Sequence, residues 1–259
     1  MIHSTALVHS SAKLAENVKV GAWSIIGENV ELNDGVVVGP HVTIEKNTRV
    51  GKNTRIVQYA SVGSDPQDVS YKSGEETWLD IGENNIIREF VTINRGTLAG
   101  KGQGKTLIGD NNYLMAYVHV AHDCEIGDHV IFANNASVAG HVTIDDHVIL
   151  GAFTGIHQFV NVGRYSFLGR ATKIVQDILP YMLVTGNPGV LTGLNSVGLK
   201  RAGFPSSALR ELKKAHQLIV SKAKKLVDIR AELLEMSEST PEIKLLVDAI
   251  DNSERGIAR

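Results

Sequence analysis

A six-residue repeat decides the fold of this chain. Residues 108–143 read IGDNNY LMAYVH VAHDCE IGDHVI FANNAS VAGHVT, and every block opens on an apolar residue. The same spacing holds over residues 8–62, 81–93 and 108–174, so that all 25 blocks have an apolar first residue. A period of six matches neither the 3.6-residue helix nor ordinary hairpins, and hexapeptide repeats are typical of a parallel β-helix.

The other positions of the repeat fit short strands joined by tight corners. Glycine often follows the first residue, as at Gly21 and Gly127, and the fifth position is often small or β-branched, as at Val42 and Cys124. We interpret the glycines as permitting the corner dihedrals and the branched residues as favouring strands. Three blocks make one triangular coil. The sequence therefore predicts an all-β left-handed parallel β-helix of about eight coils, roughly 40 Å long at ~4.8 Å per coil.

Two insertions and a change of pattern divide the chain. The repeat is interrupted at residues 64–79 and 98–107, and loops that leave a rigid solenoid often carry function. We place the hexapeptide-repeat prism over residues 1–187 and a small C-terminal α-helical domain over residues 188–259. Within it, apolar residues at helical spacing predict one helix from Pro205 through Leu226 and another from Thr240.

Composition excludes several classes of protein. With 26 Lys and Arg against 28 Asp and Glu, the net charge of −2 argues against a nucleic-acid binder. No apolar run is long enough for a membrane helix, and the N-terminus lacks a signal-peptide pattern. The single cysteine, Cys124, excludes an intramolecular disulfide framework, so we expect a cytoplasmic protein.

One stretch has a strong local charge. Residues 200–230 contain nine Lys and Arg and only two Asp and Glu. An acidic partner would be attracted to this stretch, while the alternative is a solvated helix face.

The repeat also gathers polar side chains at one corner. His122 is third in its block, and Gly140 and Gln158 take the same place one and two coils further on. His119, His141 and His157 are their neighbours in sequence. A single histidine here has a simple interpretation as a surface residue, but the cluster favours a site.

Three kinds of chemistry fit the cluster. In acyl transfer, His122 takes a hydroxyl proton, Asp123 orients the imidazole, and a backbone N–H such as that of Gly140 stabilises the oxyanion. A metal site could use His119 and His122, although their spacing suits helical zinc sites better. The third interpretation is a purely structural solenoid. A phosphate loop at residues 100–106 is rejected because the first glycine is missing and no helix pattern follows.

Taken together, the sequence resembles the UDP-N-acetylglucosamine O-acyltransferase family of lipid A biosynthesis over essentially the whole chain. The resemblance rests on the hexads, the Gln67-Asp68 insertion and the following segments: INRGT (93–97), HVAHDC (119–124), AGHV (139–142), HQF (157–159), QD (176–177), GN (186–187) and GLKRAGF (198–204). Hexads alone would be less specific, because many acyltransferases share them.

The resemblance implies a cytoplasmic homotrimer with active sites between neighbouring prisms. It implies transfer of an (R)-3-hydroxyacyl chain from acyl carrier protein to the glucosamine 3-position of UDP-N-acetylglucosamine, with no metal or organic cofactor. His122 would be the base, Asp123 its partner and Gly140 the oxyanion donor, and the acidic carrier protein would dock on the basic stretch. The substrate contacts implied are Asp68, Asn94, His119, His141, His157, Gln158, Asn195 and Arg201.

The chain departs from the family pattern at four positions. Asn94 replaces a usual histidine, Ser70 a usual lysine, and Ala202 a frequent arginine. The first two changes leave open a 3-amino sugar acceptor, which would give an amide. Arg170 occupies a position that measures acyl length, so we expect a shorter chain. The related N-acyltransferases of this fold carry an extra N-terminal domain and rank lower, and a metalloenzyme of the γ-carbonic anhydrase kind is the other alternative.

Overall fold

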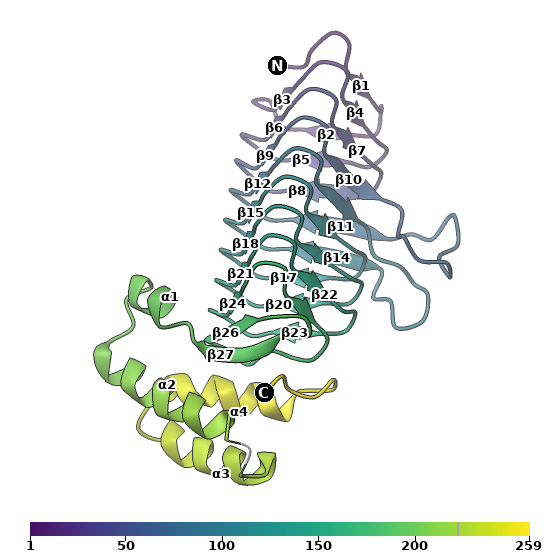
Figure 1. Ribbon diagram of the computed structural model, residues 1–259. Helices are drawn as coiled ribbons and strands as arrows, with labels where there is room; N and C mark the ends of the chain where they lie inside the picture. Colours follow the sequence, from purple (N-terminus) through teal and green to yellow (C-terminus); the bar gives the residue numbers. More distant parts are fainter. Residues whose placement is uncertain (222) are drawn as a thin grey trace.

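The prism that the repeat predicts is present in the computed structural model, which describes residues 1–221 and 223–259 (Figure 1). Short strands stack into three parallel sheets, each forming one face of a left-handed parallel β-helix. Strand partners lie one coil apart, so that Leu7 pairs with Ile25 and Val120 with Val138.

The first sheet has nine strands and carries the candidate site on its outer face. In spatial order its strands are β1 (Leu7–Val8), β4 (Ile25–Ile26), β7 (Thr43–Ile44), β10 (Ser61–Ser64), β13 (Thr92–Asn94), β16 (His119–Val120), β19 (Ser137–Val138), β22 (Gly155–Ile156) and β25 (Lys173–Ile174).

The second sheet has eight strands and carries charged residues on its outer face, among them Glu31, Arg49 and Glu125. Its strands are β2 (Lys13–Leu14), β5 (Glu31–Leu32), β8 (Thr48–Val50), β11 (Trp78–Ile81), β14 (Lys105–Ile108), β17 (Glu125–Ile126), β20 (Thr143–Ile144) and β23 (Asn161–Val162).

The third sheet has ten strands and ends in an antiparallel hairpin. Its strands are β3 (Lys19–Val20), β6 (Val37–Val38), β9 (Arg55–Ile56), β12 (Ile86–Ile87), β15 (Tyr113–Leu114), β18 (Ile131–Phe132), β21 (Ile149–Leu150), β24 (Phe167–Leu168), β26 (Met182–Thr185) and β27 (Val190–Leu194).

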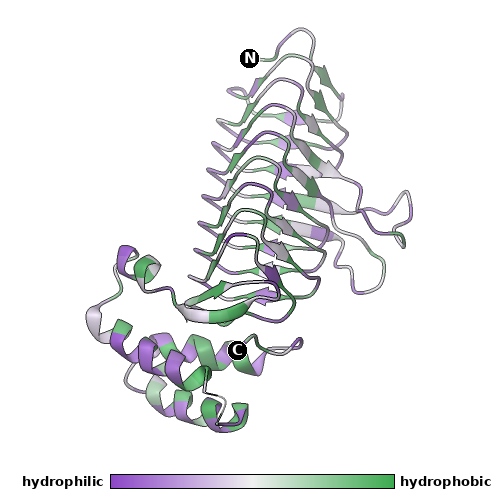
Figure 2. Cartoon of the chain, in the orientation of Figure 1, coloured by the Kyte–Doolittle hydropathy of each residue, from purple (hydrophilic) through white to green (hydrophobic). Residues whose placement is uncertain are grey.

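The first residue of each block forms the core. Ile44, Val62 and Leu114 are completely buried, and Figure 2 shows the apolar strand positions repeating from coil to coil. The fifth position also faces inward, and Val42 and Cys124 are fully buried. Because each inner position stacks on its equivalents in adjacent coils, the prism is solid, and function is confined to its outer faces, corners and insertions.

The glycine after the first residue has a different role from the one predicted. In the regular coils the left-handed backbone lies two residues further on, for example at Asn29 (φ 55) and Asp123 (φ 56). The glycine instead lets adjacent coils approach, since a Cβ on Gly27 would lie 2.9 Å from the nitrogen of Lys46. Asn and Asp enter the left-handed region more readily than most side chains, but His and aromatic residues also occupy this corner position, for example at His141 (φ 62) and Phe153 (φ 61).

Both insertions leave the prism close to the predicted places. The first lies between β10 and β11 and the second between β13 and β14. The strands beside them are longer than the two-residue strands of the regular coils, and Trp78–Ile81 pairs with Lys105–Ile108 along its whole length. The first loop is therefore shorter than predicted, and the second covers residues 95–104 instead of 98–107. Both loops project from one side of the prism (Figure 1).

The C-terminal region differs from the prediction in two ways. The third sheet continues through β27, so that the first helix, α1 (Ser196–Arg201), begins later than residue 188. The single helix predicted from Pro205 through Leu226 is wrong: α2 is Ser206–Ile219 and α3 is Leu226–Ser237. The guanidinium of Arg259 donates to the carbonyls of Ile219 (2.9 Å) and Ser221 (2.7 Å), which satisfies the end of α2.

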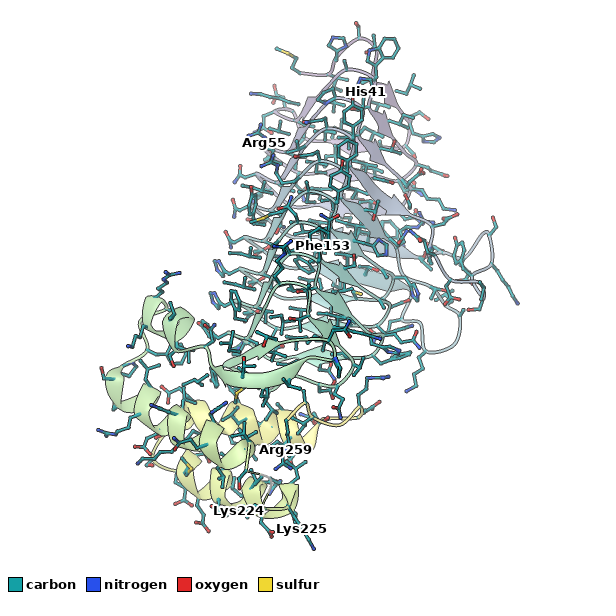
Figure 3. The ribbon with its side chains drawn as sticks, in the orientation of Figure 1. His41, Arg55, Phe153, Lys224, Lys225 and Arg259 are labelled. Carbon is teal, nitrogen blue, oxygen red and sulfur yellow. The ribbon has the colours of Figure 1, made fainter. Side chains whose placement is uncertain are left out.

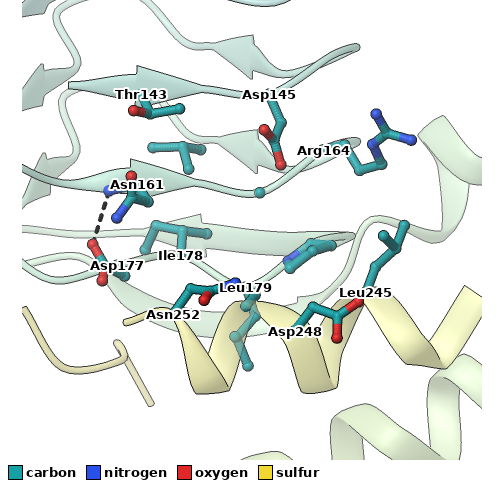
Figure 4. Close-up of a pocket in the computed structure, with 14 residues that line it drawn as sticks. Thr143, Asp145, Asn161, Arg164, Asp177, Ile178, Leu179, Leu245, Asp248 and Asn252 are labelled. Atoms are coloured by element: carbon teal, nitrogen blue, oxygen red, sulfur yellow. Dashed lines mark hydrogen bonds between the residues drawn. The ribbon is translucent and has the colours of Figure 1, made fainter. Parts of the chain in front are cut away.

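The chain ends beneath the last coils. Thr240 precedes the 3₁₀ turn η1 (Pro241–Ile243) and α4 (Lys244–Asp251), as predicted from Thr240. A cavity of about 220 Å³ remains between α4 and the prism, with Arg164 on one wall and Leu245 on the other (Figure 4). Among the described residues, every helix is too short or too polar to cross a lipid bilayer.

Candidate active site

The candidate base lies on the corner that follows β16. His122 is 8% exposed, and Asp123 next to it occupies the left-handed corner position. The imidazole lies against Gly140 one coil below, where a Cβ would come within 2.6 Å of its Cε1. Glycine at 140 is therefore required for the observed position of the ring.

The two side chains form a hydrogen-bonded pair. His122 Nδ1 lies 2.8 Å from Asp123 Oδ2. An ionised carboxylate only accepts hydrogen bonds, so the hydrogen must lie on Nδ1 and the lone pair on Nε2. This is the tautomer that a general base needs.

Asp123 is held by backbone groups of the second insertion and the segment before it. Its Oδ2 accepts from the N–H of Thr97 (3.0 Å), and its Oδ1 accepts from the N–H of Gln103 (2.9 Å). The N–H of Asp123 itself donates to the Thr106 hydroxyl (2.8 Å). With its carboxylate fixed in this way, Asp123 can orient the imidazole without moving.

Asp68, from the first insertion, approaches the other side of the base. Its Oδ2 lies 3.8 Å from His122 Nε2. The hydroxyl and N–H of Ser70 both donate to Asp68 and lower the pKa of its carboxyl group. The ring nitrogen that would take a proton therefore faces an ionised carboxylate across a gap.

Two further histidines surround the base. The His141 ring meets the His122 ring edge to face at 5.1 Å, and His119 Nδ1 lies 2.7 Å from the Thr92 hydroxyl. Burial lowers the pKa of both His119 and His141. Near neutral pH these two rings are therefore uncharged groups that can offer hydrogen bonds to a polar substrate.

A groove of about 530 Å³ runs past the base along the outer face of the first sheet. It extends from His119 on β16 to Lys173 on β25, and Ser137 and Gly155 form its floor between them. The predicted site residues that line it are His119, His122, Gly140, His157 and Gln158. The N–H of Gly140 makes no hydrogen bond with any residue that the structure describes, so it is available to a ligand.

Comparison with known proteins agrees with this arrangement. A family model described as UDP N-acetylglucosamine O-acyltransferase, domain 2, matches residues 177–258, and a bacterial transferase hexapeptide model matches residues 105–140. The acyl-[acyl-carrier-protein]–UDP-N-acetylglucosamine O-acyltransferase of Halorhodospira halophila is 46% identical over 100% of this chain and 99% of its own length. The chain belongs to this acyltransferase family.

Solved structures give the same result. LpxA from Acinetobacter baumannii has a TM-score of 0.96 at 44% identity and covers 100% of this chain and 99% of its own. The Francisella novicida UDP-N-acetylglucosamine acyltransferase has a TM-score of 0.97 at 41% identity, over 100% of this chain and 94% of its own. The acyltransferase fold is therefore shared from the first coil to the last helix.

Asp68, Asp123 and His141 surround His122 without lining the groove, and four further predicted residues lie away from both the groove and His122. The amide of Asn94 is buried and donates to the Asp65 carbonyl (2.7 Å). Asn195 is the N-cap of α1, where its Oδ1 accepts from the N–H of Gly198 (3.1 Å), and Arg201 ends the same helix. In Figure 1, α1 lies on the opposite side of the prism from the insertions. Arg170 is exposed at a corner, with its guanidinium 5.9 Å from the Phe153 ring centroid.

Sequence reasoning missed the groups that hold the His122–Asp123 pair, called the dyad below. Thr97 and Gln103 act through backbone N–H groups, which carry no residue signature. The sequence signal that could have indicated this loop is the run of glycines at 100, 102 and 104, which is typical of a tight turn. This tight loop folds back on Thr97, whose carbonyl accepts from the N–H of Gly104 (2.9 Å).

His122 and Asp123 also belong, together with His141, to the only group of potential metal-binding side chains found among the described residues. The ligand atoms of His122, Asp123 and His141 lie within 4.8 Å of one another. However, Asp123 already accepts hydrogen bonds from two N–H groups and from His122. These hydrogen bonds are arranged around a proton on Nδ1 of His122, and His119 is not part of the group, so the alternative of a metal site on His119 and His122 gains no support.

Proposed function

We propose that the chain transfers an (R)-3-hydroxyacyl group from acyl carrier protein to the 3-hydroxyl of UDP-N-acetylglucosamine, the first step of lipid A biosynthesis. The observation that carries this proposal is the His122–Asp123 pair, which places His122 in the wall of a groove beside the N–H of Gly140, a group without a hydrogen bond to any described residue. Base, orienting carboxylate and oxyanion donor are the three parts that acyl transfer needs.

The steps balance without a further reagent. Nε2 of His122 takes the hydroxyl proton as the sugar oxygen attacks the thioester carbonyl carbon. The oxyanion that forms accepts from the N–H of Gly140. The tetrahedral intermediate then expels the thiolate of the carrier protein, which takes the proton from the imidazolium. General-base catalysis contributes about 10²- to 10⁴-fold, and one oxyanion donor about 10²- to 10³-fold.

The groove and the first insertion contact different parts of the substrate. His119, His141, His157 and Gln158 offer hydrogen bonds to the sugar nucleotide, and Asp68 approaches the acceptor hydroxyl. Asn94 contributes through its contact with the first insertion. No metal or organic cofactor enters any of these steps.

We further propose that three chains share the sites. The third sheet has apolar outward residues, including Val37, Ile131 and Phe167. The edge between the third and first sheets carries exposed rings, marked by His41 and Phe153 in Figure 3, with Tyr117 and Phe153 each 55% exposed. A neighbouring prism that covered these surfaces would bring its own Asn195 and Arg201 toward the groove. Light scattering that gave a monomer would contradict this arrangement.

The basic stretch over residues 200–230 is the proposed dock for the acidic carrier protein in the cytoplasm. Within it, Lys214 pairs with Glu211, and Arg230 pairs with Asp251. Residue 222 of this stretch lies outside the described residues. The proposal requires that replacing Lys200 and Lys213 with glutamate raises KM for the acyl carrier protein substrate and leaves KM for the sugar nucleotide unchanged.

One assay tests the reaction, the acceptor and the acyl length together. The purified protein is given 3-hydroxyacyl carrier proteins from C8 to C16 with UDP-N-acetylglucosamine or its 3-amino analogue, and the product is analysed by mass spectrometry. We expect an ester and a preference for a chain shorter than C14, because the bulk of Arg170 shortens the acyl site. Arg170→Gly should shift the preference to longer chains. Amide as the main product would favour the 3-amino acceptor, and absence of both products would contradict the proposed reaction.

A further inference from the structure

The carboxylate of Glu75 joins the two insertions. Its Oε2 accepts from the N–H of Leu98 (2.7 Å) and from the hydroxyl of Thr97 (3.1 Å). Its Oε1 accepts from the N–H of Lys72 (3.1 Å) within the first insertion. These bonds lower the pKa of the Glu75 carboxyl group, with the Leu98 bond as the largest cause. Glu75 is therefore ionised at neutral pH, and its hydrogen bonds are charge-assisted.

The residue that Glu75 holds is also the one that holds the dyad. Thr97 is completely buried, and its N–H donates to Asp123 Oδ2. The loop that begins at Thr97 supplies the second donor, the N–H of Gln103. A continuous path of hydrogen bonds therefore runs from Glu75 through Thr97 to Asp123 and then to Nδ1 of His122.

The first insertion is attached at its base as well. The buried guanidinium of Arg95 binds the Gly63 carbonyl and the Asp65 carboxylate, and Asn94 donates to the Asp65 carbonyl. Asp68 lies between this anchor and Glu75. Fixing the insertion on both sides of Asp68 sets the distance between its carboxylate and Nε2 of His122.

We propose that Glu75 is a positioning residue, which locks the two insertions together and so orders both carboxylates that face the catalytic imidazole. The role of Glu75 in catalysis rests on the proposed acyl transfer, whereas its role in joining the two insertions does not. Glu75 contacts neither the imidazole nor the groove, so it acts only through Thr97 and the first insertion.

Glu76 provides a matched control. It is the next residue, it is exposed, and it makes no side-chain hydrogen bond with the residues that the structure describes. Glu75→Ala removes three hydrogen bonds, while Glu76→Ala removes the same charge from the same insertion and none of them. Glu75→Gln is the conservative variant, because its amide oxygen can still accept from Thr97 and Leu98.

The experiment measures amide hydrogen exchange and steady-state kinetics on the full-length protein. We expect Glu75→Ala to expose the Thr97 and Gln103 amides to faster exchange and to lower kcat about 10²-fold, the cost of a displacement of about 1 Å. KM for the acyl donor should stay unchanged. Glu75→Gln should recover most of both losses, and Glu76→Ala should behave as the wild type.

A second comparison shows whether Glu75 acts through the dyad. In an Asp123→Asn background, Glu75→Ala should cost far less in kcat than in the wild type, because the group it orders is already changed. Unchanged exchange at Thr97 and Gln103 in Glu75→Ala, or an equal kcat loss in both backgrounds, would overturn the proposal. If the wild type makes no product, the proposed function fails, while the exchange data still decide the role of Glu75.

Discussion

Asp123→Asn is expected to lower kcat about 10⁴-fold, the size of effect seen when the orienting carboxylate of a catalytic triad becomes an amide. In the wild type, Asp123 accepts from Thr97, Gln103 and His122, and its ionised carboxylate has no hydrogen of its own. If asparagine keeps its oxygen toward the N–H of Gln103, its NH₂ takes the place of Oδ2, beside the N–H of Thr97 and Nδ1 of His122. The imidazole must then carry its hydrogen on Nε2, where it cannot act as a base.

The change should leave the fold intact. Asparagine already occupies the same left-handed corner position at Asn111 (φ 58) and Asn135 (φ 61). Asp110→Asn is the matched control, because Asp110 also accepts from a backbone N–H, that of Glu83 (2.6 Å), away from the groove. Steady-state kinetics and thermal unfolding should show a loss of kcat for Asp123→Asn alone, with similar melting temperatures. Retention of more than a tenth of wild-type kcat in Asp123→Asn would contradict the assigned role.

Gly140→Ala is expected to lower kcat by at least about 10²-fold by moving the base. The added Cβ would lie 2.6 Å from Cε1 and 2.7 Å from Nε2 of His122, closer than nonbonded atoms approach. The ring must tilt away from Asp123, and the methyl group also crowds the N–H that we assign to the oxyanion. Both effects act on the reacting atoms.

Gly193→Ala controls for the general cost of adding a methyl group. Gly193 lies in β27, and its added Cβ would have its nearest neighbour, Leu183 Cδ2, at an ordinary 3.9 Å. Activity should therefore persist in this variant. A crystal structure of Gly140→Ala with an undisturbed His122 and full activity would show that the close approach is incidental.

The prism could be predicted because each six-residue block carries its own signal. Each apolar first residue, such as Val120 or Ile144, must face the interior, and the period of six allows one way to do so. Stacking at 18 residues then places Gly140 below His122 without any knowledge of the loops. The corner dihedrals were misassigned because glycine serves two purposes, close approach and positive φ, and the sequence does not distinguish them.

The support around the site could not be predicted in the same way. Thr97 and Gln103 contribute backbone N–H groups, which any residue possesses. Glu75 acts across two insertions whose conformations depend on tertiary contacts rather than on the repeat. The end of α2 at Ile219 depends on Arg259, 40 residues away in sequence. Such long-range contacts have no periodic signal.

The central claim is that Nε2 of His122 removes the proton from the acceptor hydroxyl. The direct measurement is single-turnover formation of 3-O-acylated UDP-N-acetylglucosamine from 3-hydroxyacyl carrier protein by the wild type and by His122→Ala, both correctly assembled. The account predicts ester from the wild type and a rate at least about 10²-fold lower for His122→Ala, within the range of general-base catalysis. Ester formed at the same rate by both proteins would contradict it.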